Sequence, residues 1–238
     1  MKTMICVILD RSGSMQGRES DVVGGVNKFL EEQRKVDKPA SIAFVRFDGE
    51  AVERFRPMGD LKACADLSAG EYSPRGSTPL LDAVGKTLAD LDEDWKREAP
   101  DQAVVVIVTD GQENASREYT QAKVKGMIES RQKSGKWMFI YLGADVDAFA
   151  ESHKLGIPMS NSAGYVKSAA GMASMTASMS ASVGTMRITG SKVASNLGGN
   201  IGEAGDVKAF DQNATSGAAP ISPARAWSEP GKAWTPPA

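Results

Sequence analysis

Two short apolar runs constrain the fold of this chain more than any other feature. Residues 4–9 stand near the start of the 238-residue sequence, and residues 104–108 lie near its middle. Neither run alternates apolar with polar side chains, a pattern typical of strands that are buried on both faces. Stretches of helical periodicity lie between and after these two runs. A chain in which strands alternate with helices in this way indicates a parallel sheet covered by helices on both sides. We therefore expect an α/β fold with a doubly wound, mostly parallel central sheet.

The periodicity places the expected elements along the first 160 residues. The turn pair Asp48-Gly49 between two short strands indicates a hairpin, and Pro79 suits the first turn of a helix. The expected strands span 3–9, 41–47, 51–56, 102–109 and 137–142, and the expected helices span 20–36, 79–97, 116–134 and 146–154.

Oxygen-bearing side chains gather in three of the expected loops. Asp10-Arg11-Ser12-Gly13-Ser14 follows the first strand, Gly76-Ser77-Thr78-Pro79 precedes a helix, and Thr109-Asp110-Gly111 ends the strand near the middle of the chain. Asp, Ser and Gly are also ordinary turn and cap residues, so the first segment alone is ambiguous. Loops at the carboxyl ends of parallel strands converge, however, and carboxylate and hydroxyl oxygens suit Mg²⁺. Together the three loops predict a single cation site.

The order of these residues resembles the metal-ion-dependent adhesion site of the von Willebrand factor A (vWA) domain family. That site reads Asp-x-Ser-x-Ser, then Thr, then Asp, and the resemblance covers residues 2–160. It implies a divalent cation bound by the hydroxyls, with the carboxylates acting directly or through water, and it implies that the hairpin supplies one antiparallel edge strand. The matching metal-site positions are Asp10, Ser12, Ser14, Thr78 and Asp110.

Such a site favours binding over catalysis. Neutral hydroxyls leave the ion electrophilic, so we expect a non-enzymatic module that captures an Asp or Glu side chain of a protein partner through Mg²⁺, with Mn²⁺ or Ca²⁺ as possible substitutes. The only histidine, His153, lies far along the sequence, and no nucleophile with a general base accompanies the motif. An Mg²⁺-dependent phosphoryl-transfer enzyme is a less favoured alternative, because the chain lacks a Walker lysine loop and a second carboxylate in the first loop.

Charged residues near the three loops are candidates for a ligand-binding rim. Arg11 lies inside the first loop, Arg75 precedes the second, and Glu113 follows the third. Basic side chains there would steer an acidic ligand toward the ion, although exposed loop charges commonly do no more than interact with solvent.

The composition changes after residue 160, and we divide the chain into a vWA domain (1–160), a Ser/Ala/Met-rich helix (161–187) and a Gly/Pro-rich flexible tail (188–238). Apolar residues recur in the helix at near-heptad spacing, which indicates packing on the domain or, alternatively, a docking surface for another helix. These residues are Met172, Met175, Met179, Val183 and Met186.

The tail contains a repeated basic-Ala-Trp-hydroxyl pattern that ends in proline. Trp227 and Trp234 are candidate partner-docking residues, because extended aromatic and proline segments commonly anchor in grooves. The alternatives are a chance duplication and a tail that anchors on its own domain. This pattern supports a second functional hypothesis, a structural component of a larger assembly, such as a phage particle, that contacts its partners through helix and tail.

Composition restricts the remaining classes. The formal net charge of −2 argues against nucleic acid as the main partner, and the two cysteines form no disulfide framework, with Cys6 expected as a buried thiol. The first expected strand begins close to Met1, which leaves no room for a signal peptide, and no apolar run is long enough to cross a membrane. We expect a cytoplasmic protein, or a virion-associated one if a phage encodes it. The sequence carries no signal for an oligomeric state.

Overall fold

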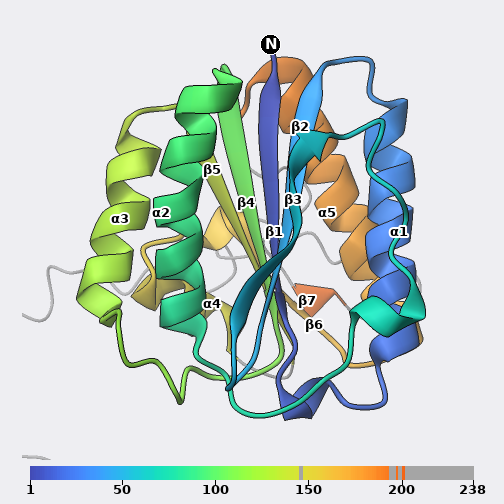
Figure 1. Ribbon diagram of the computed structural model, residues 1–238, viewed down its shortest axis with the longest axis vertical. Helices are drawn as coiled ribbons and strands as arrows, with labels where there is room; N and C mark the ends of the chain where they lie inside the picture. Colours follow the sequence, from blue (N-terminus) through green and yellow to red (C-terminus); the bar gives the residue numbers. More distant parts are fainter. Residues whose placement is uncertain (145–146, 193–196, 198–199, 202–238) are drawn as a thin grey trace, which may run out of the picture.

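Seven strands form one sheet in the computed structural model, which describes residues 1–144, 147–192, 197 and 200–201 (Figure 1). The strand order is β3-β2-β1-β4-β5-β6-β7, and all neighbours pair in parallel except β2 and β3. The expected α/β fold with one antiparallel edge strand is confirmed. The strands are β1 (Thr3–Asp10), β2 (Ala40–Phe47), β3 (Val52–Asp60), β4 (Gln102–Thr109), β5 (Trp137–Ala144), β6 (Ser162–Tyr165) and β7 (Asn200–Ile201).

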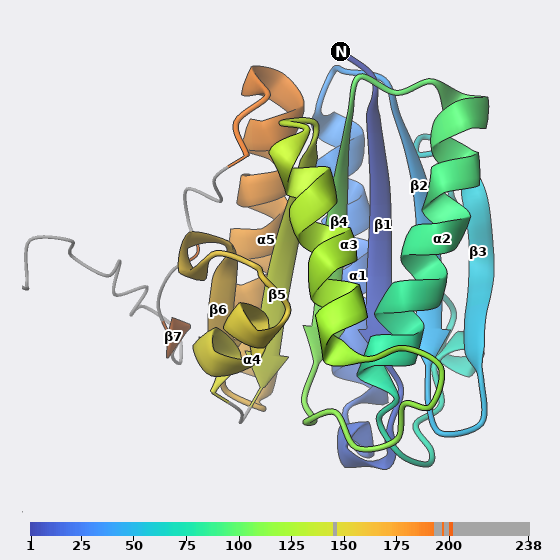
Figure 2. The same cartoon turned by 90° about the vertical axis from the view of Figure 1, so that its left-hand side faces the viewer.

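Helices cover both faces of the sheet (Figures 1 and 2). Two of them, α1 (Glu19–Lys35) and α5 (Ala169–Thr189), lie side by side on one face. The opposite face is covered by α2 (Leu80–Glu98), α3 (Gln121–Lys133) and α4 (Ala148–Lys154). Short 3₁₀ turns occur at Gly13–Met15, Ala69–Glu71 and Met159–Asn161.

The sheet divides the core into two halves, and strand β1 contributes to both, because successive side chains of a strand point to opposite faces. Ile5 and Val7 pack among side chains of α1 and α5, whereas Cys6 and Ile8 pack among those of α2 and α3. Cys6 is a buried free thiol, as expected, and burial raises its pKa to about 12. A strand buried on both faces explains why residues 4–9 show no polar alternation.

The segment after residue 160 differs from the expected single helix. Ser162–Tyr165 forms the short strand β6, which pairs with β5 and buries Ala163 and Tyr165, and α5 then runs from Ala169 to Thr189. Four residues are too few for a period-2 pattern to be recognised in the sequence. The expected flexible tail (188–238) also includes regular structure. Its first two residues belong to the end of α5, and Asn200–Ile201 forms the strand β7 beside β6.

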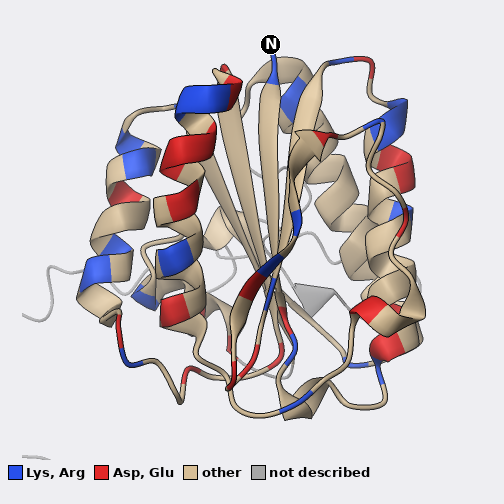
Figure 3. Ribbon diagram, viewed as in Figure 1, with Lys and Arg blue, Asp and Glu red and all other residues tan. Residues whose placement is uncertain are grey.

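Helix α5 packs on the sheet through its regularly spaced apolar side chains. This agrees with the first of the two interpretations of the sequence, packing on the domain. Its recurring apolar residues are buried against the core, and Arg187, its only charged residue, is buried too. Arg187 donates hydrogen bonds to the backbone carbonyls of Gln33 in the last turn of α1 and of Lys38 in the link that follows. This arrangement fixes α5 to α1 and leaves the rest of α5 without charge (Figure 3).

Helix α3 begins later than expected, at Gln121 rather than at residue 116. The preceding backbone amides of Arg117, Glu118 and Tyr119 donate hydrogen bonds to the Asp82 carboxylate of α2. These tertiary contacts satisfy the amides without a helical turn, and Thr120 caps the helix instead.

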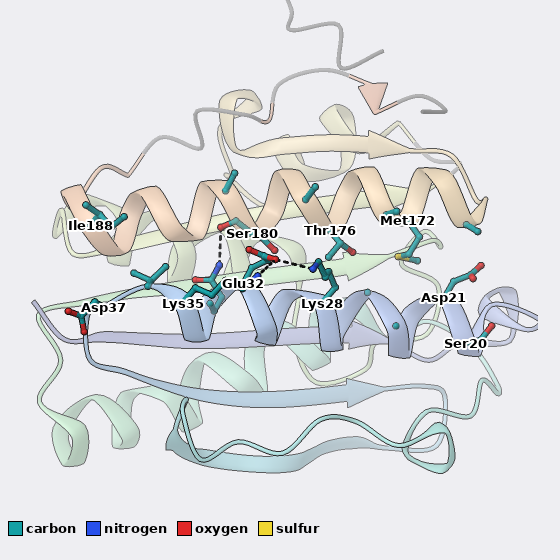
Figure 4. Close-up of a pocket in the computed structure, with 18 residues that line it drawn as sticks. Ser20, Asp21, Lys28, Glu32, Lys35, Asp37, Met172, Thr176, Ser180 and Ile188 are labelled. Atoms are coloured by element: carbon teal, nitrogen blue, oxygen red, sulfur yellow. Dashed lines mark hydrogen bonds and ion pairs between the residues drawn. The ribbon is translucent and has the colours of Figure 1, made fainter. Parts of the chain in front are cut away.

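A groove of about 880 Å³ runs along the outer side of α1 and α5 (Figure 4). Small residues such as Gly24, Ala173 and Ala177 line it, and Ile188 at one end is 57% exposed. Among the helices of the described ranges, none has both the length and the apolar character needed to span a membrane.

Candidate functional site

The predicted site residues come together at the carboxyl ends of the neighbouring strands β1 and β4. From β1 the chain continues to β2 on one side and later to β4 on the other, so the carboxyl ends of β1 and β4 border a topological switch point. Asp10 is the last residue of β1, and Asp110 directly follows β4. The fold therefore brings together two carboxylates that are far apart in the sequence.

Asp10 is buried and held in one orientation. Its Oδ1 accepts a hydrogen bond from the Ser12 backbone amide at 2.7 Å, and its Oδ2 accepts one from Thr109 Oγ1 at 2.6 Å. The Tyr72 hydroxyl donates to the Asp10 backbone carbonyl. Burial raises the pKa of Asp10; hydrogen bonds from Thr109 and Ser12 oppose this rise, while the negative charge of Asp110 adds to it. A nearby cation would favour the ionised carboxylate.

The two serines of the first loop connect this carboxylate to Asp110. Ser12 precedes the 3₁₀ turn Gly13–Met15 as its N-cap residue, and its Oγ lies 3.0 Å from Ser14 Oγ. Ser14 Oγ donates a hydrogen bond to Asp110 Oδ1 at 2.6 Å. Asp10, Ser12, Ser14 and Asp110 thus form one continuous hydrogen-bonded cluster.

The Thr78 loop lies against the same cluster. A Cβ at Gly111 would lie 2.9 Å from Thr78 Oγ1, so the glycine permits the threonine hydroxyl to approach the backbone next to Asp110. Asn114 fixes the loop through two hydrogen bonds. Its side-chain Oδ1 accepts from the Thr78 backbone amide at 2.9 Å, and its backbone amide donates to the Thr78 backbone carbonyl at 3.2 Å. Asn114 therefore positions Thr78.

Asp48, which the sequence indicated only as a turn residue, joins the loops. Its carboxylate is fully buried and lies 2.5 Å from the Arg11 guanidinium and 3.0 Å from Arg75 Nε. Burial alone would raise the pKa of Asp48, but backbone hydrogen bonds from Glu50 and Ala51 and the two arginines outweigh burial and lower it. The charge pattern of the sequence did not reveal this pairing, because the partners lie on separate elements.

The three expected rim residues are engaged in contacts within the protein. Arg11 is only 5% exposed, and Arg75, which is more exposed, also pairs with Glu50. Glu113 accepts hydrogen bonds from the Leu81 backbone amide and from Ser116. Their contact with a ligand stays a prediction. Trp227 and Trp234 lie outside the described residues.

A lysine that the motif does not contain also reaches the cluster. Lys167, between β6 and α5, places its Nζ 2.9 Å from Asp110 Oδ2. No signal in the sequence identifies this lysine, because its position depends on the strand β6, which was not expected.

The chemistry of the cluster fits a hard divalent cation. Its donors are carboxylate and hydroxyl oxygens, the ligands that Mg²⁺ prefers. Asp110 Oδ2 is buried, and its close partner among the described residues is a cation, the Lys167 ammonium at 2.9 Å, so this oxygen stands in a position that suits a positive charge. Within the described ranges, no group of three or more His, Cys, Asp or Glu side chains could hold a metal ion, and the candidate cluster combines two carboxylates with serine hydroxyls.

Comparison with solved structures identifies the fold. The vWA domain of SpRpn10 matches with a TM-score of 0.53 at 12% identity, over 75% of this chain and 94% of that domain. A von Willebrand factor type A structure from Catenulispora acidiphila matches with a TM-score of 0.54 at 18% identity, over 76% of this chain and 42% of that one. This chain has the vWA fold.

Other comparisons define how far the vWA likeness extends. Proximal thread matrix protein 1 from the mussel byssus matches with a TM-score of 0.55 at 14% identity, over 75% of this chain and 45% of that protein. The match thus spans less than half the length of the byssus and Catenulispora proteins. No protein-family model and no curated protein matches the sequence. At these identities the likeness establishes the vWA fold alone.

Proposed function

We propose that this vWA-fold protein is a metal-ion-dependent binding module that captures an acidic side chain of a protein partner. The observation that carries the proposal is the hydrogen-bonded cluster of Asp10, Ser12, Ser14 and Asp110 at the switch point, in which the carboxylates of two distant strands meet the hydroxyls of one loop. Carboxylates and hydroxyls converge there on one end of the sheet.

Each site residue has a role in this proposal. Ser12, Ser14 and Thr78 would hold the cation, and Asp10 and Asp110 would bind it directly or through water. The bound ion would supply an electrophilic centre for an anionic oxygen. Mg²⁺ is the proposed ion, and Mn²⁺ or Ca²⁺ can substitute where oxygen ligands dominate.

We infer binding rather than catalysis. His153, the only histidine of the chain, lies in α4, and the Ser14 and Thr109 hydroxyls donate to the carboxylates of Asp110 and Asp10 rather than to a histidine. Loops on a rigid sheet are suited to present a fixed cation to an incoming carboxylate. The partner is therefore a protein that offers an exposed Asp or Glu.

The first test is metal binding by the full-length chain. Titration calorimetry and thermal unfolding with Mg²⁺ should show binding and a raised Tm in the wild type, and both should be lost in Asp10→Ala and weakened in Ser12→Ala. Ser130→Ala removes an exposed hydroxyl from α3 and serves as the matched control. Equal Mg²⁺ effects in the wild type and Asp10→Ala would contradict the proposed site.

The second test is capture of the partner. Pull-downs from a lysate of the native host, with Mg²⁺ or with EDTA, compare the wild type with Asp10→Ala. A protein retained only by the wild type in Mg²⁺, and released by excess of a short acidic peptide, supports the proposal. A partner retained in all conditions would instead favour the structural alternative, in which α5 and the C-terminal segment make the contacts.

A further inference from the structure

Lys167 reaches the candidate site from the last part of the sheet. It lies in the link between β6 and α5, and β6 runs parallel to β5, so its carboxyl end faces the same edge as those of β1 and β4. Its Nζ lies 2.9 Å from the buried Oδ2 of Asp110, the oxygen that does not accept from Ser14. The ammonium group therefore lies where a cation bound to that oxygen would be.

The backbone of this link is tightly fixed. The Ser168 amide donates to the Val166 carbonyl at 2.7 Å, and Ser168 Oγ accepts a hydrogen bond from the Gly171 amide at 3.0 Å. A Cβ at Gly171 would lie 2.1 Å from the Val166 carbonyl oxygen, so the link packs directly on the first turn of α5. The Lys167 side chain is a flexible four-carbon stem that is 24% exposed, so it can leave Asp110 by a change of its own rotamer.

A positive charge within the site would offset the repulsion between its two buried carboxylates. Asp10 and Asp110 are both buried, and their negative charges disfavour each other in the low-dielectric surroundings. Ser14 already donates to the other oxygen of Asp110, which leaves Oδ2 for a positive charge. Lys167 supplies that charge at ion-pair distance.

We propose that Lys167 is an internal cation that occupies the metal-facing oxygen of Asp110 in the metal-free protein and is displaced when a divalent ion binds. The inference rests on the proposed function, because it concerns the same site. An ammonium group and a divalent ion repel each other and compete for one carboxylate oxygen. Lys167 accordingly stabilises the metal-free state and lowers the affinity for metal.

The experiment compares the wild type with Lys167→Met, which keeps the length of the stem and removes its charge. Lys96→Met is the matched control, because Lys96 is an exposed lysine near the end of α2, at the opposite end of the sheet. Titration calorimetry of the full-length proteins with Mg²⁺ and with Mn²⁺ gives the Kd. We expect Lys167→Met to bind about tenfold more tightly than the wild type and Lys96→Met to bind like the wild type.

Thermal unfolding in EDTA gives a second readout that needs no metal. Lys167→Met should unfold at a lower temperature than the wild type, because the buried carboxylates lose their counter-charge, and added Mg²⁺ should restore more stability than it adds to the wild type. Lys167→Gln, which is polar but uncharged, should behave in the same way and replaces the methionine variant if that variant does not fold.

The outcomes separate this inference from the proposed function. Metal binding by the lysine variants alone, or tighter binding by them, supports the inference. If the wild type binds metal and both Lys167 variants bind it equally or more weakly, the proposed role of Lys167 is wrong. The proposed metal site is then unaffected. Absence of Mg²⁺ and Mn²⁺ binding in every protein overturns both.

Discussion

Replacing Asp48 by Asn should destabilise the protein strongly, although Asp48 belongs to none of the motif loops. The carboxylate is fully buried and pairs with Arg11, which is almost as deeply buried. Asn keeps the shape and one hydrogen-bond acceptor but removes the negative charge. Among the described residues, Arg11 would then retain Glu53, at 3.3 Å, as its anionic partner.

The magnitude follows from the burial of this pair. Removing one partner of a buried ion pair costs about 3–5 kcal/mol, because the other charge stays buried without compensation. The retained Asn acceptor places Asp48→Asn near the lower end, at about 3 kcal/mol. For a domain of this size, that loss corresponds to a fall in Tm of roughly 6–12 °C.

The assay is urea unfolding and thermal unfolding at neutral pH, followed by the same measurements in acid. Since the pKa of Asp48 is lowered in the folded protein, its stabilising contribution is present above the ordinary carboxyl pKa of about 4 and is lost as the pH falls through the lowered value. The stability difference between the wild type and Asp48→Asn should therefore shrink in acid. Glu93→Gln, which breaks a highly exposed pair with Lys96 at 2.7 Å, is the control and should leave the Tm unchanged.

Two results would refute this reasoning. An Asp48→Asn variant as stable as Glu93→Gln at neutral pH would show that burial does not make the Arg11 pair important. A deficit that persists undiminished below the lowered pKa would show that the loss comes from shape rather than charge.

Three further changes have defined outcomes. Gly111→Ala should weaken Mg²⁺ binding several-fold in calorimetry, because its Cβ would lie 2.9 Å from Thr78 Oγ1, whereas Gly126→Ala in α3, with open space around it, should keep the affinity and stabilise the helix by up to about 1 kcal/mol; equal affinities would count against Thr78 as a ligand. Arg187→Met should lower the free energy of unfolding in urea by about 2–4 kcal/mol, because the buried Gln33 carbonyl and the partly buried Lys38 carbonyl lose a charged donor; an unchanged midpoint would contradict that role. Deletion of residues 205–238 should preserve the Mg²⁺-induced rise in Tm, and its loss would show that the C-terminal segment is part of the site.

The sequence by itself determined the type of sheet. Residues 4–9 and 104–108 are apolar without alternation, a pattern typical of strands covered on both faces, and stretches of helical periodicity lie between and after them, so the parallel arrangement could be predicted without coordinates. Helices with a long apolar stripe, such as α2, were placed within a residue or two. Elements whose signal is local and repeated are the ones that a sequence specifies.

Elements that depend on distant partners were not predictable in this way. The strand β6 has only four residues and exists through its pairing with β5, and the start of α3 depends on hydrogen bonds to Asp82 of α2. Neither interaction leaves a periodic pattern in the sequence.

The residues of the candidate site could be predicted from the sequence, whereas the contacts around them could not. The order and spacing of Asp10, Ser12, Ser14, Thr78 and Asp110 could be read directly, because each lies in a loop next to a recognisable element. The tertiary structure alone decided the surroundings: Asp48 pairs with Arg11, and Lys167 reaches Asp110 from a link 57 positions further along the chain. Sequence patterns report which residues precede and follow one another, whereas burial and charge pairing depend on which strands the fold places at one edge of the sheet.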